Sequence, residues 1–376
     1  MRLKVLMEAP IPPPCGGIST WTEGLLSVSS MDQDVQIVHV DSAVRFRSIG
    51  NMNLAVRFFG GTIHGVALFF KFAAKLIFQR IDVAHICMGG SLGTCRDFVL
   101  VAFARMLRVP TVVHLRFGRL PAKVALMNWE AVLIGWICRL SKCAIVLDPA
   151  SEKAVRALAP ECSVFEVPNP AWKINEIAPE TKILHKVRTV LFVGHVIPTK
   201  GVSELIMACR EIVDSDFKLD VIGPVENEYR QELLNLAIMK DNGKWINIQG
   251  HVNGSEIPFR MAQAQMVVLP SYTEGFPNVI LEAMCLSKPV IATPVGAISK
   301  ILDFDGINPC GIEVPVQDVN ALKNAIETLL WRPDYALQLG INGRKRVESE
   351  YSPDAIYEKY KIIWERIGGK TESISN

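Results

Sequence analysis

Residues 266–293 read MVVLPSYTEGFPNVILEAMCLSKPVIAT, and this stretch decides the fold. The run Met266–Leu269 has no polar alternation, which is typical of a strand that is buried on both faces. Pro277 suits the first turn of a helix, because its missing N–H costs nothing there. We expect that helix over Asn278–Leu286 and a second strand from Pro289. The stretch therefore predicts a strand–loop–helix–strand unit of a parallel sheet.

The loop after the first of these strands predicts a ligand site. Open parallel sheets bind their ligands at the carboxyl ends of their strands. The first N–H groups of the following helix have no partner within the helix, so they favour an anion. Glu274 stands in the loop and Glu282 stands inside the helix. A carboxylate beside an anion site is unfavourable unless it serves a ligand, so we expect a ligand that combines a phosphate with sugar hydroxyls.

The string P-S-x-x-E-G-F-P-x-V-I-L-E-A-M, followed by K-P-V-I-A-T, resembles the donor-site signature of family 4 glycosyltransferases. The two glutamates, eight positions apart, match the paired glutamates of that family. The resemblance implies an α/β protein of the GT-B type, with two Rossmann-like parallel-sheet domains that face a cleft, and a retaining reaction. The alternative is an ordinary βαβ unit whose glutamates are solvated.

The resemblance also implies a role for each matching residue. Glu282 would bind the ribose hydroxyls and Glu274 the hydroxyls of the donor sugar. The backbone of four consecutive residues would hold the phosphate and the sugar: Gly275, Phe276, Pro277 and Asn278.

A second loop, G-H-V-I-P-T-K-G, follows a strand expected over Val190–Gly194. A cation at the start of the next helix opposes the helix dipole, so a ligand explains Lys200 better than a surface position does. The loop resembles the family pattern G-R-x-x-x-x-K-G, whose arginine and lysine hold the donor diphosphate. Lys200 matches this pattern, and His195 replaces the arginine. A histidine would substitute only in part, with its pKa raised by the phosphates.

Two further positions follow from the resemblance. The segment Ile246–Val252 resembles the one whose backbone reads the nucleotide base, which makes Val252 a candidate contact. Lys300 stands where the family commonly has a glutamate. With His195, Lys300 keeps open the possibility of a subunit that binds without catalysing.

In the first half, a strand over Arg2–Met7 leads to Gly16 and Gly17, and a helix is expected from about Ser19 to Val28. A glycine pair before a helix start allows the backbone to approach a phosphate closely. The glycine pair is equally compatible with a plain turn. The family usually carries such a loop between the acceptor and the donor phosphate, and this resemblance favours the binding role.

The segment V-V-H-L-R-F-G contains two candidate substrate contacts, His114 and Arg116, on one face of a strand. His114 is open to a second interpretation as a hydrogen-bonded core histidine. Arg116 is the better candidate for a phosphate partner. The family often ends this strand in histidine–glycine, so the displaced His114 does not transfer simply. One long amphipathic helix is expected over Leu120–Lys142.

The expected organisation is two domains with a crossing helix. Residues 1–170 would form an acceptor-side domain and residues 187–351 the nucleotide-sugar domain. A charged hinge over residues 171–186 would join them. By resemblance, the helix over residues 353–367 would pack back on the first domain.

Composition narrows the class of protein. The chain has 376 residues, enough for two domains, and its mean hydropathy is +0.24. No charge-free run reaches the roughly 18 residues of a membrane-spanning helix, and the first residues are expected to form a strand and not a signal peptide. Nine cysteines without a C-x-x-C pair favour reduced thiols in the cytoplasm and predict no zinc site.

Charge is distributed unevenly along the chain. Residues 1–170 carry 18 Lys and Arg against 12 Asp and Glu, and no acid occurs over Ser42–Ile81 or Phe98–Trp129. An anionic membrane surface or a phosphate-bearing acceptor fits this balance better than nucleic acid, for which no reader motif is present. The apolar and basic segment 52–80 is either a core helix with a solvated basic edge or a helix that rests on lipid headgroups.

Together these features predict a retaining glycosyltransferase that moves a sugar from a nucleotide-sugar to a saccharide or lipid-linked acceptor in polysaccharide or glycolipid biosynthesis. No Asp-x-Asp pair or His/Cys cluster is evident in the sequence, so no metal or other cofactor is expected. Two alternatives stay open: a sugar-nucleotide epimerase of the same shape, and a non-catalytic nucleotide-sugar-binding subunit. A cytoplasmic protein, peripheral on the inner face of the cell membrane, is the expected location.

Overall fold

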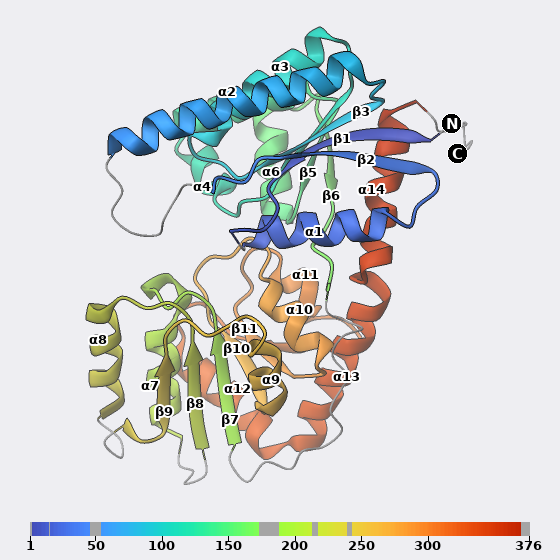
Figure 1. Cartoon of the computed structure of the whole chain (residues 1–376). Coiled ribbons are helices and arrows are strands. Elements are labelled where there is room, and N and C mark those ends of the chain that lie inside the picture. The colour runs from blue at the N-terminus through green and yellow to red at the C-terminus, as the bar shows by residue number, and fades with distance from the viewer. Residues whose placement is uncertain are drawn as a thin grey trace. The chain divides into compact units, whose positions relative to one another are not determined.

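The computed structural model describes residues 2–14, 16–45, 54–172, 188–212, 217–238 and 243–369, without the side chains of residues 54–60 (Figure 1). The chain divides into two compact units. The first comprises Met1–Pro170 and Pro353–Asn376, and the second comprises Ala171–Ser352. The predicted hinge over residues 171–186 lies almost entirely outside the described residues.

The first unit is built on a six-stranded parallel sheet with the order β2-β1-β3-β4-β5-β6. Its strands are β1 (Leu3–Ala9), β2 (Val35–Asp41), β3 (Val83–Met88), β4 (Thr111–Leu115), β5 (Cys143–Val146) and β6 (Ser163–Glu166). All residues of β3, β4 and β5 are buried, as expected for central strands that helices cover on both faces.

Helices cover both faces of this sheet. Figure 1 shows α1 and α14 on one side and α2 with α3 on the other. The helices are α1 (Gly17–Ser29), α2 (Leu54–Phe78), α3 (Gly93–Met106), α4 (Leu120–Ala125), α5 (Trp129–Leu140), α6 (Pro149–Leu158) and α14 (Pro353–Ile367). The C-terminal helix α14 thus belongs to the first unit, where its Tyr360 and Trp364 are fully buried.

The second unit repeats the architecture with the strand order β12-β11-β10-β7-β8-β9. Its strands are β7 (Arg188–Val193), β8 (Phe217–Ile222), β9 (Ile246–Gln249), β10 (Met266–Leu269), β11 (Val290–Ala292) and β12 (Gly311–Glu313). Its helices are the 3-10 turn η1 (Pro198–Lys200), α7 (Val202–Arg210), α8 (Asn227–Ile238), α9 (Ile257–Gln263), α10 (Asn278–Cys285), α11 (Ile298–Leu302), α12 (Val319–Trp331) and α13 (Pro333–Glu350). The predicted strand–loop–helix–strand unit is β10, α10 and β11, so this part of the prediction is confirmed.

The single helix predicted over Leu120–Lys142 is wrong. Met127 adopts a left-handed conformation (φ 43°), which ends α4. The side-chain oxygen of Asn128 then accepts a hydrogen bond from the N–H of Ala131 and caps α5. Asn128 therefore begins a new helix, although it interrupts a continuous apolar pattern that by itself predicts one helix.

The expectation on membrane spans also needs a correction. Helix α2 contains one window, Gly61–Phe78, that is long and apolar enough to cross a membrane by length and composition. The search for charge-free runs missed it because Lys71 and Lys75 interrupt the window. The same helix contributes Leu68, Phe72 and Leu76 to the core of the first unit, as a core helix of a globular domain does.

Candidate functional site

The second sheet has its topological switch point between β7 and β10. From β7 the chain proceeds to β8 and β9 on one side, and β10, β11 and β12 lie on the other side. In open parallel sheets the ligand crevice lies at the carboxyl ends of the two strands that flank this point. The loops that follow β7 and β10 carry the two motifs singled out from the sequence. Topology therefore brings the Lys200 loop and the Glu274 loop together, although 74 residues separate the pair along the chain.

Lys200 and Glu274 form an ion pair at this point. The Lys200 Nζ lies 2.5 Å from Oε1 of Glu274, and the Ser271 hydroxyl donates to the same oxygen at 2.8 Å. Both charged side chains are largely withdrawn from solvent, with 21% of Lys200 and 11% of Glu274 exposed. The loop thus presents one cation whose charge is partly balanced and one carboxylate that two donors hold in place.

Backbone contacts fix the two loops against each other. Tyr272 N–H donates to the carbonyl of Thr199 at 2.9 Å. Gly201 has φ 69°, and a Cβ at this position would overlap the carbonyl oxygen of Pro270. A side chain here would therefore separate the loops, and only glycine permits this close approach. The Tyr272 hydroxyl adds a hydrogen bond of 2.6 Å to Glu204 on α7.

The third loop at this edge packs on the second. Gly296 has φ 62°, and a Cβ there would meet the carbonyl oxygens of Glu274 and Gly275. The N–H of Ala297 donates to the carbonyl of Gly275 at 2.9 Å. The Thr293 hydroxyl donates to the carbonyl of Ser271 at 2.5 Å. The glycine-rich turn that follows β11 therefore acts as a support for the glutamate loop.

Two helices begin at this edge without a side-chain cap. Helix α7 starts after Gly201 and helix α10 starts after Pro277, and neither has a side-chain acceptor at its N-cap. The N-terminus of an α-helix carries a partial positive charge and favours anions. With Lys200, the edge therefore offers three sources of positive potential at the ends of two neighbouring strands.

The other predicted donor-site residues lie on the same unit. Glu282 is half-buried on α10, in the second turn, and Asn278 is exposed at the start of that helix. Gly275 and Phe276 are half-buried, Pro277 is buried, and the ring of Phe276 packs near Tyr351 with centroids 6.4 Å apart. His195 is exposed in the Lys200 loop, and Val252 is half-buried after β9. Lys300 is exposed on α11. The ligand roles of all these residues stay predictions.

In the first unit, the switch point lies between β1 and β3. Helix α1 begins at Gly17 directly after β1, with Gly16 as an N-cap that has no side-chain acceptor. Both glycines are exposed, and a Cβ on Gly17 would meet no atom within 4 Å. The fold itself therefore does not require glycine at Gly17, and the space above it is open.

His114 and Arg116 occupy the interior of the first unit. His114 has no exposed surface and Arg116 is 8% exposed. The Arg116 guanidinium lies 4.1 Å from the centroid of the Trp21 ring and donates to Oδ1 of Asn169 at 2.7 Å. Asn169 lies near the end of the first predicted domain, and no role was predicted for it from the sequence. The structure favours the core interpretation for His114, and it gives Arg116 a set of internal partners.

A buried polar chain links α14 to this arginine. The indole N–H of Trp364 donates to Nδ1 of His85 at 2.9 Å, Nε2 of His85 faces Nδ1 of His114 at 3.3 Å, and Nε2 of His114 faces Arg116 at 3.3 Å. Both ends of the chain are N–H donors, and each neutral imidazole carries one further proton. Four protons therefore meet three contacts, so one contact is not a hydrogen bond. A further proton on either histidine would worsen this mismatch.

Burial and the arginine charge keep the two imidazoles neutral. Burial, followed by the charge of Arg116, lowers the pKa of His85 to about 3. The same two causes, with a contribution from His85, hold the pKa of His114 well below its usual value.

The structure also corrects the expectation that no His/Cys cluster exists. His85, Cys87 and His114 lie on neighbouring strands, in register, with ligand atoms within 4.8 Å of one another. Burial raises the pKa of the Cys87 thiol, which disfavours the thiolate that a metal requires. The Arg116 charge lies against the same group. The three residues therefore form a poor site for a cation, although the sequence gives no sign that they meet.

The fold and this site define a class: a protein of two Rossmann-like units with a candidate anion site at the switch point of the second sheet. The GT-B fold class predicted from the sequence is confirmed by solved structures that cover the chain almost completely. Sucrose-phosphate synthase from Thermosynechococcus elongatus matches with a TM-score of 0.72 at 19% identity, over 98% of this chain and 100% of that one. HepE from Anabaena, solved in complex with UDP, matches with a TM-score of 0.71 at 16% identity, over 97% of this chain and 100% of that one. At these identities the likeness shows the fold alone.

The family comparison concerns the second unit. Residues 173–346 match the family model of glycosyl transferases group 1. A capsular polysaccharide biosynthesis glycosyltransferase, CapM from Staphylococcus aureus, is 32% identical over 49% of this chain and 47% of that protein. An uncharacterized glycosyltransferase, MJ1178 from Methanocaldococcus jannaschii, is 35% identical over 45% of this chain and 44% of that protein. The matched region thus spans about half the length of these curated relatives. The predicted resemblance to glycosyltransferases is confirmed for this region.

Proposed function

We propose that the chain is a retaining, metal-independent glycosyltransferase that moves a sugar from a nucleotide-sugar donor to a saccharide or lipid-linked acceptor in polysaccharide or glycolipid biosynthesis. The observation that carries the proposal is the Lys200–Glu274 ion pair at the switch point of the second sheet. CapM acts, by its name, in capsular polysaccharide biosynthesis, and HepE is described in complex with UDP and UDP-glucose. The first description supports a polysaccharide product, and the second supports a nucleotide-sugar donor.

The donor's charge decides where it would lie. The diphosphate would lie over the starts of α7 and α10, where Lys200 and the first N–H groups face it. When the bond between sugar and phosphate breaks, negative charge grows on the leaving diphosphate, and a cation already in place stabilises that charge without reorganisation. Exposed His195, in the same loop, would add positive charge when protonated.

The two glutamates would divide the rest of the donor between them. Glu274, in the loop beside Lys200, would accept hydrogen bonds from the sugar hydroxyls, and Ser271 keeps its carboxylate in position. Glu282, farther along α10, would accept from the ribose hydroxyls. The backbone from Gly275 to Asn278 would orient the phosphate and the sugar, and Val252 would contact the base.

The first test is transfer itself. Purified protein is incubated with a panel of labelled nucleotide-sugars and with lipid and saccharide extracts, and calorimetry measures the affinity for each nucleoside diphosphate. We expect transfer with one base and one sugar, with the anomeric configuration of the donor retained, and with full activity after chelation of divalent metals. Conversion of the free nucleotide-sugar to an epimer would support the epimerase alternative, and nucleotide binding without any transfer would support the binding subunit.

We also propose that the first unit rests on an anionic membrane surface. Helix α2 buries one stripe in the core and exposes a second apolar stripe, in which Ile63 is 70%, Val66 51%, Phe70 66% and Ile77 57% exposed. Because α2 also contributes to the core, it would lie along the lipid surface and not across the bilayer. Each basic side chain near an anionic surface adds about 1 kcal/mol of attraction.

Vesicle sedimentation tests this proposal. The protein is expected to pellet with anionic vesicles at low salt, to stay in solution with neutral ones, and to release as salt rises. A Phe70→Ser variant is expected to reduce pelleting, while Ile307→Ser, at a residue of the second unit that is 98% exposed, serves as the matched control. Pelleting that ignores lipid charge would remove the support for this location.

A further inference from the structure

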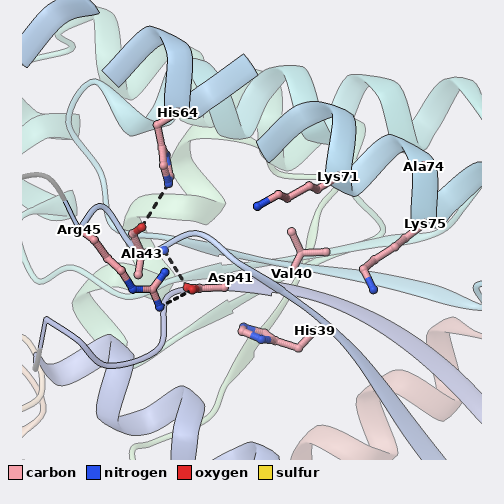
Figure 2. A pocket seen from close by; sticks show the side chains of 9 residues that line it. All are labelled: His39, Val40, Asp41, Ala43, Arg45, His64, Lys71, Ala74 and Lys75. Atoms are coloured by element: carbon pink, nitrogen blue, oxygen red, sulfur yellow. Dashed lines mark hydrogen bonds and ion pairs between the residues drawn. The ribbon is translucent and has the colours of Figure 1, made fainter. Parts of the chain in front are cut away.

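A cavity of about 790 Å³ lies between helix α2 and the carboxyl end of strand β2, in the first unit (Figure 2). Nine residues line it: His39, Val40, Asp41, Ala43, Arg45, His64, Lys71, Ala74 and Lys75. Its volume falls within the range of roughly 300–1,000 Å³ that is usual for ligand pockets. The cavity lies at the carboxyl end of β2, and open parallel sheets bind ligands at the edge formed by the carboxyl ends of their strands. The motifs of the donor site do not include any of these residues.

Three basic groups of the cavity come from one face of α2. His64, Lys71 and Lys75 are spaced by 7 and 4 residues, which places all three on one face of a helix. This face adjoins the buried stripe of Leu68 and Phe72. Figure 2 shows the three side chains projecting from α2 toward the end of β2, with Arg45 beside Asp41. The helix therefore presents His64, Lys71 and Lys75 to the cavity.

The charges in the cavity do not balance. Asp41 is its single acid, and that carboxylate is already bound by Arg45 at 2.6 Å and by the N–H groups of Ala43 at 2.9 Å and Ile11 at 3.2 Å. Burial opposes ionisation of Asp41, but these donors outweigh it and hold its pKa below the usual value. In the part of the chain that the structure describes, neither Lys71 nor Lys75 has a hydrogen bond or an ion pair. Two ammonium groups thus face the cavity without a counter-charge from the described residues.

The pKa of His64 depends in part on the positive charges around the cavity. Its Nε2 donates to the carbonyl of Ala43 at 3.2 Å, so Nδ1 is the acceptor in the neutral ring. Burial, together with the charges of Arg96 on α3 and Lys71, lowers the pKa of His64, against the Ala43 carbonyl and Asp41, which raise it. A bound anion would oppose the effect of the cations and favour the protonated ring.

We propose that this cavity binds the phosphate group of the acceptor, held by Lys71, Lys75 and His64. Two unpaired ammonium groups and a histidine suit a dianion better than a single carboxylate, and the volume leaves room for the group that the phosphate is attached to. The inference deepens the proposed function, because it gives the acceptor a chemical class: a phosphomonoester or a diphosphate. The phosphate would come either from a lipid headgroup or from a soluble sugar phosphate, and the experiment separates the two.

The test follows the His64 imidazole by NMR on histidine-labelled full-length protein, in a phosphate-free buffer at low salt. Added inorganic phosphate is expected to move the His64 resonance saturably and to raise its pKa. Lys71→Gln and Lys75→Gln are each expected to weaken this binding roughly tenfold, since each removes one charge-assisted contact. Lys153→Gln, which makes the same charge change at an exposed position of α6, is expected to leave the titration unchanged. Lys71→Arg, which keeps the charge, should retain binding and shows that a loss is not due to misfolding.

The source of the phosphate is decided by competition. Vesicles that contain phosphatidate in phosphatidylcholine will displace inorganic phosphate from the cavity if the headgroup of a lipid is the ligand. If glycerol phosphate displaces it and the vesicles do not, the ligand is soluble. Both outcomes support the site. A His64 signal that does not respond to phosphate, or one that responds equally in the Lys71→Gln and Lys75→Gln variants, overturns it.

The phosphate titration and the transfer assay can succeed or fail independently of each other. Nucleoside diphosphate affinity, measured by calorimetry on the same variants, reports on the second unit and is expected to be unchanged. A phosphate site that persists in a protein without transfer activity would disprove the glycosyltransferase and leave the cavity assignment intact. Transfer that continues without any phosphate response would do the reverse.

Discussion

Replacement of Lys200 by methionine tests the donor site most directly, because it removes the charge and keeps the length of the side chain. Lys200 lies at the end of η1, where its Nζ contacts Glu274 at 2.5 Å and 21% of the side chain is exposed. The position is solvent-poor enough for its charge to act strongly on a bound diphosphate. The usual loss for one such donor is about 2–4 kcal/mol of transition-state stabilisation, or roughly a 30- to 1,000-fold loss in kcat.

The ion pair also allows a prediction of how the Lys200→Met and Glu274→Gln changes combine. Without Lys200, the Glu274 carboxylate retains the Ser271 hydroxyl but loses its counter-charge, and it then repels the incoming diphosphate. The single variant thus suffers both a lost attraction and a new repulsion. Glu274→Gln removes the repulsion, so the double variant should lose less activity than the sum of the two single losses. Residues in direct contact commonly show coupling energies of about 0.5–3 kcal/mol.

The assay is single-turnover transfer for the four proteins of the double-mutant cycle, with circular dichroism to confirm folding. Lys323→Met is the matched control, since Lys323 forms a longer ion pair of 3.4 Å with Glu211, which is 48% exposed. Exposed pairs of this kind contribute little, so the control should keep its activity. Parental turnover in Lys200→Met would refute the diphosphate assignment. Strictly additive losses across the cycle would refute the coupling through Glu274.

Three further predictions concern other parts of the molecule. Glu282→Gln should weaken nucleotide binding in calorimetry, while Glu274→Gln should spare free nucleotide affinity and lower turnover; equal affinities for Glu282→Gln and the parent would exclude the ribose role. Gly201→Ala should cost about 1–3 kcal/mol in urea unfolding, because the left-handed backbone and the Pro270 carbonyl both oppose a side chain. The same change at Gly93, which meets no atom within 4 Å, should not. The pKa values of the buried His85 and His114 lie far below those in the unfolded chain, so the pair takes up protons only on unfolding. The contribution of the neutral pair to the free energy of unfolding is therefore complete above pH 6.5 and is lost as the pH falls below it. The free energy of unfolding of the first unit, followed by tryptophan fluorescence, should therefore fall by about 2 kcal/mol between pH 6.5 and 5.5, and a flat profile over this range would contradict this.

The donor half of the molecule could be predicted from the sequence because its signals are local. The strand Met266–Leu269, the loop with Glu274 and the helix with Glu282 are adjacent along the chain, and each carries its own pattern of apolar runs and prolines. The structure has the elements β10, α10 and β11 within a residue or two of the predicted bounds. The contact between Lys200 and Glu274 needed one further step, because the order of the strands, and not the sequence spacing, brings their loops together.

Parts of the first unit could not be predicted, because their structure depends on contacts outside the local pattern. The sequence analysis treated Leu120–Lys142 as one helix, because the apolar period continues through Asn128, whose capping role depends on a bond to a backbone N–H. Helix α2 shows the same limit. Its sequence does not tell which apolar residues face the core and which are exposed, because this depends on how the helix packs on the sheet. Composition could suggest a basic, apolar segment, and only packing could show which residues face the cavity.

The buried chain from Trp364 to Arg116 shows what sequence spacing cannot supply. Its members come from α14, β3, β4 and the segment after β4, and they meet only because β3 pairs with β4 in a register that sets Cys87 opposite His114. A histidine on a strand is compatible with a ligand site and with the core, and the number of available donors decides between them. Here an indole and a guanidinium occupy both ends of a pair of neutral imidazoles. The two histidines therefore tie the C-terminal helix to the centre of the first sheet. This polar connection already holds one proton more than it can place, so we expect a further proton to weaken the packing of α14.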